Sequence, residues 1–157
     1  MISKALFSSS SAEWETPAEV FDPLNAEFGP FDLDAAATKT NTKAPYYYTK
    51  VGDGLRGDWT GRAVWLNPPY GTGIAQWISK AFNQTLDGGR GPASVVVVLV
   101  PARTDTEWWH TFVEPYRGTP RVEVRFLKGR VPFVRADGKR SRAPFPSVVL
   151  IFRRLPQ

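Results

Sequence analysis

The stretch "SVVVVLVP" (residues 94–101) decides the fold class of this chain of 157 residues. A run of branched apolar side chains without polar alternation is typical of a strand covered on both faces, as in a parallel sheet. "SVVLIF" (147–152) predicts a second strand of this kind, and "VEVRF" (122–126) alternates as a half-buried strand does. These three segments predict the centre of a sheet.

Shorter strands are expected upstream, over "FDLD" (31–34), "APYYYT" (44–49) and "AVWL" (63–66). Helical spacing of apolar residues lies between the strands, over residues 16–28, 73–87 and 104–116. This alternation, with two strands at the end, predicts an α/β fold. Ligands of such sheets bind outside the carboxyl ends of the strands, so function should be sought there.

The first helix carries start signals in the sequence "TPAE" (16–19). We expect Thr16 as the N-cap, Pro17 as the first helical residue and Glu19 as the partner in a capping box. Pro23 leaves open whether this helix is bent or split.

The composition predicts one globular domain over residues 13–157, preceded by a flexible lead at residues 1–12. The absence of cysteine excludes disulfides, thiolate zinc sites and a cysteine nucleophile, and the single His110 excludes an all-imidazole metal site, so no metal is expected. No apolar run reaches the roughly 20 residues that span a bilayer, and the N-terminus lacks the apolar core of a signal peptide. We expect a cytoplasmic protein without a membrane partner.

Charge is unevenly distributed along the chain. Residues 1–60 carry five Lys/Arg against nine Asp/Glu, a net of −4, whereas residues 121–157 carry ten against two, a net of +8. The basic end fits a polyanion such as nucleic acid, although a charge that serves only solubility is the alternative. The cations cluster in a predicted loop over residues 128–144, at Lys128, Arg130, Arg135, Lys139, Arg140 and Arg142.

The sequence "NPPY" (67–70) follows the strand at 63–66. Asn67 precedes a proline and is therefore pushed to an extended conformation, so its amide oxygen can project from the strand end beside the Pro68 carbonyl. Tyr70 adds a flat aromatic face. The alternative is a structural loop that merely ends the strand.

Two acceptors beside an aromatic ring suit a planar group that bears an NH2. The lone pair of such an amine is delocalised into its ring, and acceptors that hold both hydrogens favour a pyramidal, more nucleophilic nitrogen. Stacking on Tyr70 can contribute about 1–3 kcal/mol per base. This chemistry needs no metal, thiol or strong base, but it needs a strong electrophile opposite the nitrogen.

These residues resemble an S-adenosylmethionine-dependent DNA adenine-N6 methyltransferase of the phage-type Dam group. The resemblance covers residues 13–153 and includes "EWETP", "FDLDAAA", "DGLRGDW", "NPPY", "VPARTDTEWWH" and "FLKGRVPF". It implies a Rossmann-like methyltransferase sheet, mostly parallel with an antiparallel C-terminal strand. It also implies double-stranded DNA as substrate, with the target adenine flipped out of the duplex.

The resemblance also implies the site residues. Thr16 and Pro17 would line the methionine pocket of the cofactor, and Asp34 would face its polar tail. Asp58 would accept a hydrogen bond from the cofactor's adenine. The full implied cofactor site is Trp14, Thr16, Pro17, Asp34, Ala35, Asp58 and Trp59, and the implied catalytic residues are Asn67, Pro68, Pro69 and Tyr70.

Two features depart from the family pattern. "DAAAT" (34–38) replaces the usual glycine-rich motif, and no acidic residue ends the strand at 44–49. We expect no separate target-recognition domain within these 157 residues, so the 128–144 loop is expected to contact DNA. Cytosine-C5 methylation is excluded because it needs a cysteine. Cytosine-N4 methylation, glutamine-N5 methylation of a protein and a catalytically silent DNA-binding domain remain alternatives.

Overall fold

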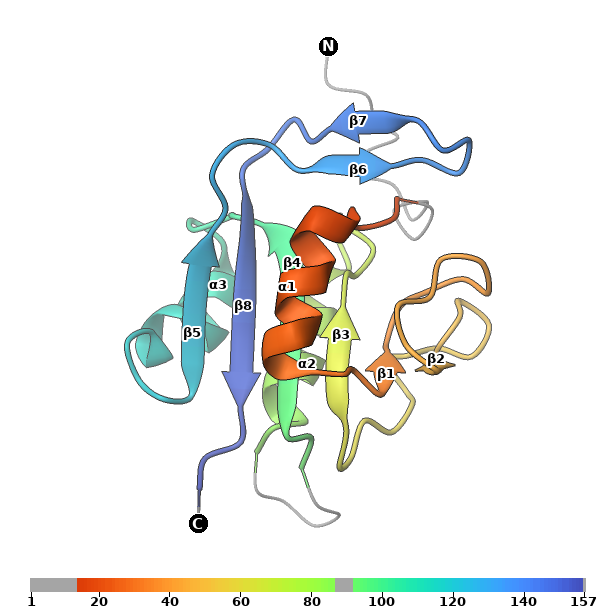
Figure 1. Cartoon of the computed structure of the whole chain (residues 1–157). Coiled ribbons are helices and arrows are strands. Elements are labelled where there is room, and N and C mark those ends of the chain that lie inside the picture. Colours follow the sequence, from red (N-terminus) through yellow and green to blue (C-terminus); the bar gives the residue numbers. More distant parts are fainter. Residues whose placement is uncertain (1–13, 87–91, 157) are drawn as a thin grey trace.

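The computed structural model describes residues 14–86 and 92–156, so the predicted lead at residues 1–12 lies outside the described residues. Its centre is a six-stranded sheet in the order β2-β1-β3-β4-β8-β5 (Figure 1). The strands are β1 (Leu33–Asp34), β2 (Tyr46–Tyr47), β3 (Ala63–Leu66), β4 (Val95–Pro101), β5 (Val122–Phe126) and β8 (Ser147–Arg153). Neighbours from β2 to β4 are parallel, whereas β8 runs antiparallel to both β4 and β5. The predicted α/β class, with its antiparallel C-terminal strand, is confirmed.

The sheet centre is buried on both faces, as the sequence of β4 predicts. Residues 96–100 of β4 and 148–152 of β8 are at most 1% exposed, and the two strands pair over their whole lengths. Full burial of a Val, Leu or Ile side chain contributes roughly 1.5–3 kcal/mol, so this pair supplies much of the apolar stabilisation.

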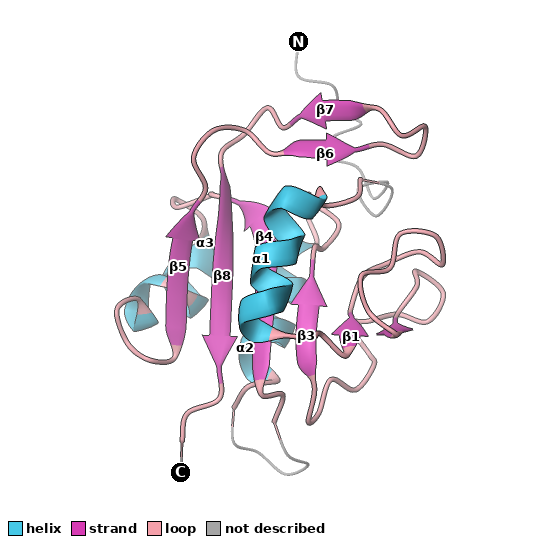
Figure 2. Cartoon of the chain, viewed as in Figure 1, coloured by secondary structure: helices cyan, strands magenta, loops and turns pink. Residues whose placement is uncertain are grey.

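Helices cover both faces of the sheet (Figure 2). α1 (Ala18–Phe28) lies on one face and buries Phe21 against Trp65 of β3, with ring centroids 5.1 Å apart. α2 (Ile74–Asn83) and α3 (Glu107–Phe112) lie on the other face. No helix within residues 14–86 and 92–156 is long and apolar enough to cross a membrane.

The start of α1 differs from the prediction. Pro17, not Thr16, is the N-cap, and its carbonyl accepts from the Val20 and Phe21 amides. No side chain caps the helix, because proline has no side-chain acceptor; the Thr16 hydroxyl, one residue earlier, accepts from Asn67. The helix runs through Pro23 without a break.

Residues 128–144 form a hairpin rather than the predicted loop. β6 (Pro132–Val134) and β7 (Arg140–Arg142) pair antiparallel around a turn in which Gly138 has φ +80°. Phe133 anchors the hairpin because its side chain is 2% exposed. The backbone of Glu15 pairs with Val134 through N···O distances of 2.8 and 2.9 Å. The hairpin therefore lies beyond the carboxyl end of β3, against the N-terminal segment (Figure 1).

Candidate active site

Asn67 follows the last residue of β3, and three polar groups hold its half-buried side chain. Its Nδ2 donates to the Trp14 carbonyl (3.3 Å) and to the Thr16 hydroxyl (3.2 Å). Its Oδ1 accepts from the Tyr70 hydroxyl at 2.7 Å. The strand end, the N-terminal segment and the "NPPY" turn thus meet at one amide.

Tyr70 is buried in this structure, whereas the sequence predicted an exposed ring. The side chain is 6% exposed, and its ring meets Phe133 and Phe145 edge-on, at centroid distances of 6.2 and 5.6 Å. Its hydroxyl also lies 3.2 Å from the Leu99 carbonyl. Burial raises the pKa of Tyr70, so the hydroxyl stays protonated and donates to Asn67. Base stacking on this ring stays a prediction that requires the two phenylalanines to move.

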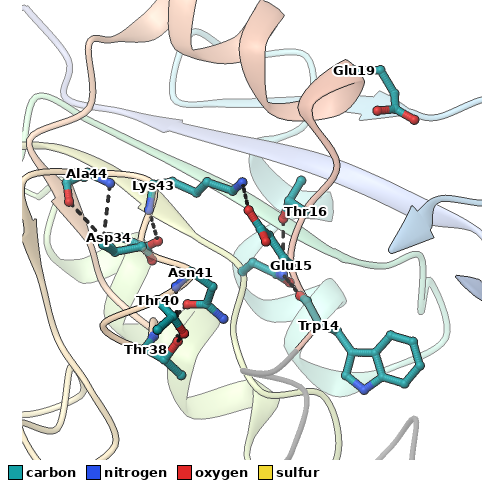
Figure 3. Close-up of polar contacts among 12 residues, drawn as sticks. Trp14, Glu15, Thr16, Glu19, Asp34, Thr38, Thr40, Asn41, Lys43 and Ala44 are labelled. Atoms are coloured by element: carbon teal, nitrogen blue, oxygen red, sulfur yellow. Dashed lines mark hydrogen bonds and ion pairs between the residues drawn. The ribbon is translucent and has the colours of Figure 1, made fainter. Parts of the chain in front are cut away.

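Asp34 ends β1 and is 3% exposed. Its carboxylate oxygens accept from the Lys43 amide (3.0 Å) and the Ala36 amide (3.3 Å). Burial raises the pKa of this carboxyl group to about 7, although the two amides and the Lys43 charge oppose the shift. Figure 3 shows that the Lys43 side chain turns away to Glu15, at 2.5 Å, while its amide faces Asp34.

A cavity of about 150 Å³ adjoins Pro69 at the carboxyl edge of the sheet. Its wall combines the residues that follow β1, β2 and β3 with Trp77 of α2. The lining residues are Ala35, Ala36, Ala37, Tyr48, Thr49, Lys50, Asp53, Gly54, Pro69 and Trp77. The alanines of "DAAAT" are short, which leaves this space open. Ala36 also lines a smaller recess that contains Thr16, Asp34 and Asn67.

The structure brings together most of the predicted cofactor residues. Trp14, Thr16 and Asp34 line the recess beside Asn67, and Ala35 lines the cavity. Pro17 follows directly as the N-cap of α1.

Asp58 and Trp59 lie outside both spaces. Asp58 precedes the amino end of β3, is exposed, and accepts from the Thr60 amide at 2.8 Å. Trp59 is fully buried, and its Nε1 donates to the Gly54 carbonyl at 3.0 Å. Trp59 therefore supports the loop that carries part of the cavity wall.

Of the residues that line the cavity, only Ala35 and Pro69 were predicted from the sequence, and Asp53 and Gly54 are among those that were missed. Asp53 was read only as a turn former, which it is, because its Oδ1 accepts from Leu55 at 3.1 Å and its φ is +50°. It also lines the cavity, while its carboxylate is held by the Leu55 amide and by Arg56. Gly54 packs so closely that a Cβ there would lie 2.0 Å from the Ala35 carbonyl oxygen. The "GDG" pattern (52–54) is the sequence feature that could have indicated this tight loop.

The predicted DNA-contacting residues are exposed on and beside the hairpin. Arg140 forms an ion pair with Glu19 of α1, and Arg135 lies 3.8 Å from Asp137 and over the Trp14 ring. Among the described residues, the remaining four form no ion pair: Lys128, Arg130, Lys139 and Arg142. Phe133 of the hairpin contacts Tyr70, which places β6 beside the "NPPY" turn.

The chain is similar to known proteins, two of which are named as DNA N-6-adenine-methyltransferases and one as a putative methyltransferase. The DNA N-6-adenine-methyltransferase of Haemophilus phage HP1 is 31% identical over 122 residues, which cover 77% of this chain and 65% of that protein. The enzyme of the same name from Escherichia phage T1 is 33% identical over 97 residues, covering 61% of this chain and 38% of that protein. A putative methyltransferase of Escherichia coli K12, YfdM, is 39% identical over 64 residues, covering 37% of this chain and 70% of that protein.

The chain thus spans less than two thirds of the length of either phage protein, at 65% and 38%. The model of the family described as DNA N-6-adenine-methyltransferase (Dam) matches residues 4–157. This match covers nearly the whole chain, including the "NPPY" turn, the cavity wall and the hairpin. The predicted resemblance is confirmed, and the chain belongs to the DNA N-6-adenine-methyltransferase (Dam) family.

Proposed function

We propose that this chain transfers a methyl group from S-adenosylmethionine to N6 of adenine in DNA. The observation that carries the proposal is the position of Asn67. It lies at the carboxyl end of β3, its amide is held from two sides, and an open cavity adjoins the same turn. Ligands of α/β sheets bind at this edge.

The chain's residues supply polarity rather than acid–base chemistry. When bound, S-adenosylmethionine would supply an electrophilic methyl group: the bond from this methyl to adenine N6 would form as its bond to sulfur breaks, sulfur would keep the electron pair, and N6 would then release one proton to solvent. The nitrogen gains positive charge as the new bond forms. The oxygens of the Asn67 amide and the Pro68 carbonyl, both uncharged, would accept hydrogen bonds from this nitrogen. Their fixed dipoles would stabilise its positive charge.

The residues around the cavity and the recess beside it support this site as the place where the cofactor would bind. The alanines that follow β1 leave room for its adenosine end between Tyr48 and Trp77, with Asp53 as a hydrogen-bond acceptor in the wall. Residues that line the narrow recess beside Asp34 would contact the methionine end. A buried carboxyl group with a raised pKa suits a cationic partner, because a nearby ammonium group would stabilise its ionised form.

The hairpin would hold the DNA backbone while the target base leaves the duplex. Its exposed cations suit phosphate contacts. A flipped adenine needs the space that Phe133 and Phe145 occupy over Tyr70. DNA binding is therefore expected to displace these two rings, so that Tyr70 becomes available for stacking.

The substitution Asn67→Ala tests the proposal. Loss of one preorganised hydrogen-bonding group typically lowers kcat by about 10²–10³. We expect a loss of this size in methyl transfer to DNA, with the calorimetric Kd for S-adenosylmethionine changed by less than about threefold. Asn83→Ala on the exposed surface of α2 is the control and should behave as the unsubstituted chain does.

Two results would contradict the proposal. One is Asn67→Ala with unchanged methylation, which would remove Asn67 from the chemistry. The other is an unsubstituted chain that binds DNA but shows neither cofactor heat nor transfer, which would favour a catalytically silent DNA-binding domain.

A further inference from the structure

The side-chain amide of Asn67 could be placed in two orientations, which differ by exchange of its oxygen and its NH2. The Trp14 carbonyl decides between them, because a carbonyl oxygen accepts hydrogen bonds and cannot donate. It lies 3.3 Å from Nδ2. In the exchanged orientation two oxygens would face each other there, so Oδ1 is directed toward Tyr70 and the "NPPY" turn.

Thr16 is the second group at Nδ2, and its position is rigid. The residue is 2% exposed, and its hydroxyl oxygen lies 3.2 Å from Nδ2. On one side, Glu15 is held by two backbone hydrogen bonds to Val134. On the other, Pro17 caps α1 with φ −68° and ψ 151°. The backbone that carries the hydroxyl is therefore held on both sides.

The local sequence predicts that the Thr16 hydroxyl caps α1 instead of contacting Asn67. A threonine before a helix usually caps it, and loss of such a cap is destabilising. Here α1 begins without a side-chain cap, and the hydroxyl contacts Asn67 from 51 residues away in sequence. A residue that breaks a local rule in favour of a distant contact marks a functional constraint.

We propose that Thr16 is a positioning residue, whose hydroxyl, together with the Trp14 carbonyl, holds Nδ2 of Asn67 so that Oδ1 faces the target nitrogen. The inference rests on the proposed function and deepens it. It gives Thr16 a role through Asn67 in the chemical step, in addition to lining the methionine pocket. Its signature is a loss in kcat without a loss in cofactor affinity.

The pair Thr16→Ser and Thr16→Ala tests this role. Both variants lack the threonine methyl group, and they differ from each other only in the hydroxyl. Losing one anchoring hydrogen bond should lower kcat by about threefold to tenfold in Thr16→Ala. Thr16→Ser should retain most of the activity. The Kd for S-adenosylmethionine should agree between the two variants within about twofold.

Thr85→Val is the matched control. Thr85 is also a buried threonine, at 1% exposure, whose hydroxyl donates to a backbone carbonyl, that of Phe82 at 2.8 Å. It lies at the end of α2 rather than at the "NPPY" turn. Its loss should lower the melting temperature while leaving kcat unchanged. A fall in kcat with Thr85→Val would mean that any lost buried hydroxyl impairs the enzyme.

The outcomes separate the two proposals. Equal kcat in Thr16→Ser and Thr16→Ala would overturn the positioning role and leave the methyltransferase function intact. A weaker cofactor Kd with unchanged kcat in Thr16→Ala would assign Thr16 to the methionine pocket alone, and would overturn the inference as well. An unsubstituted chain that neither binds S-adenosylmethionine nor methylates DNA would remove the proposed function, and this inference with it.

Discussion

Asp34 shows how the fold changes the chemistry of a single residue. The carboxyl group lies at the end of a buried strand, where its ionised form loses hydration, and burial raises its pKa to about 7. Two backbone amides compensate in part, at 3.0 and 3.3 Å. The ionisation of this group should therefore be visible in the pH dependence of stability.

Between the ordinary aspartate pKa and about 7, the native chain binds more protons at Asp34 than the unfolded chain does. The contribution of Asp34 to stability therefore falls as pH rises through this window, by up to about 4 kcal/mol. Asn cannot titrate, so the deficit of Asp34→Asn relative to the unsubstituted chain should shrink between pH 5 and pH 8. Urea unfolding at several pH values measures it.

Asp32→Asn is the control for this prediction. It replaces the exposed aspartate two residues earlier, whose Oδ2 accepts from the Ala63 amide at 2.8 Å. The change in unfolding free energy that Asp32→Asn causes measures the general cost of replacing Asp by Asn in this segment. An Asp34→Asn deficit that stays constant with pH after this correction would contradict a raised pKa.

Among the elements, the β6–β7 hairpin differs most from its prediction. The cations of this segment are exposed, as expected of a basic loop. The strand β6 was not predicted, because the basic residues around the Asp-Gly turn obscure the alternation of the buried Val131 and Phe133. Pairing with Glu15 could not be foreseen either, because it joins segments more than 100 residues apart. By contrast, β3 and β5 have the bounds that their sequence patterns predict.

The hairpin's cations differ in availability. Arg140 is engaged by Glu19, whereas Arg142 on the same strand forms no ion pair among the described residues. Arg142→Ala should therefore weaken DNA binding more than Arg140→Ala does. It should also reduce the slope of log K against log salt concentration by about 0.9. Titration of labelled duplex at several salt concentrations measures this, and an unchanged slope would place the contact surface elsewhere.

Glu19 is expected to weaken DNA binding at the hairpin, whereas Arg142 is expected to strengthen it. Its ion pair with Arg140 holds the pKa of Glu19 below its usual range, so it is charged at neutral pH and repels phosphate. Glu19→Gln should tighten DNA binding severalfold at low salt. The control is Glu114→Gln, which also breaks an exposed ion pair with an arginine, Arg117, but near the amino end of β5. Equal effects of the two substitutions would show that only net charge matters.

In the whole molecule, part of the charge asymmetry is neutralised internally. Glu27 accepts from both terminal nitrogens of Arg125, at 2.6 Å each, and Glu19 pairs with Arg140. The acidic front and the basic back of the sequence therefore contact each other, and the full net charge of the basic end does not face a ligand. This pairing depends on where α1 packs, which charge counting along the sequence does not reveal.

The centre of the sheet could be predicted because β4 and β8 are continuous apolar runs and β5 alternates. The cavity wall could not be predicted in full. Asp53 and Gly54 reach it only because the loop before β3 folds back onto the Ala35 carbonyl, and Asp58, the more suggestive carboxylate, points away. Residues that follow strand ends were placed well, and residues that depend on loop closure were not.

Arg121 bridges the end of α2 and the end of β8. Its guanidinium group is buried and donates to the carbonyls of Thr85, Phe82 and Arg153, at 2.9–3.0 Å. Arg121→Ala removes a charged donor from each of these carbonyls, of which Phe82 keeps the Thr85 hydroxyl, and should lower the free energy of unfolding by about 3 kcal/mol, measured by urea. Arg117→Ala, which removes an exposed arginine, should change it little. Equal losses would contradict the bridging role.

The central claim is that the Asn67 corner grips the amino group of adenine while S-adenosylmethionine occupies the adjoining cavity. Incubation of the chain with methyl-labelled S-adenosylmethionine and duplex DNA, followed by digestion to nucleosides, tests it most directly. The account predicts label in N6-methyladenine alone, and its loss in Asn67→Ala. Label in N4-methylcytosine, or no labelled nucleoside from any DNA, would contradict it.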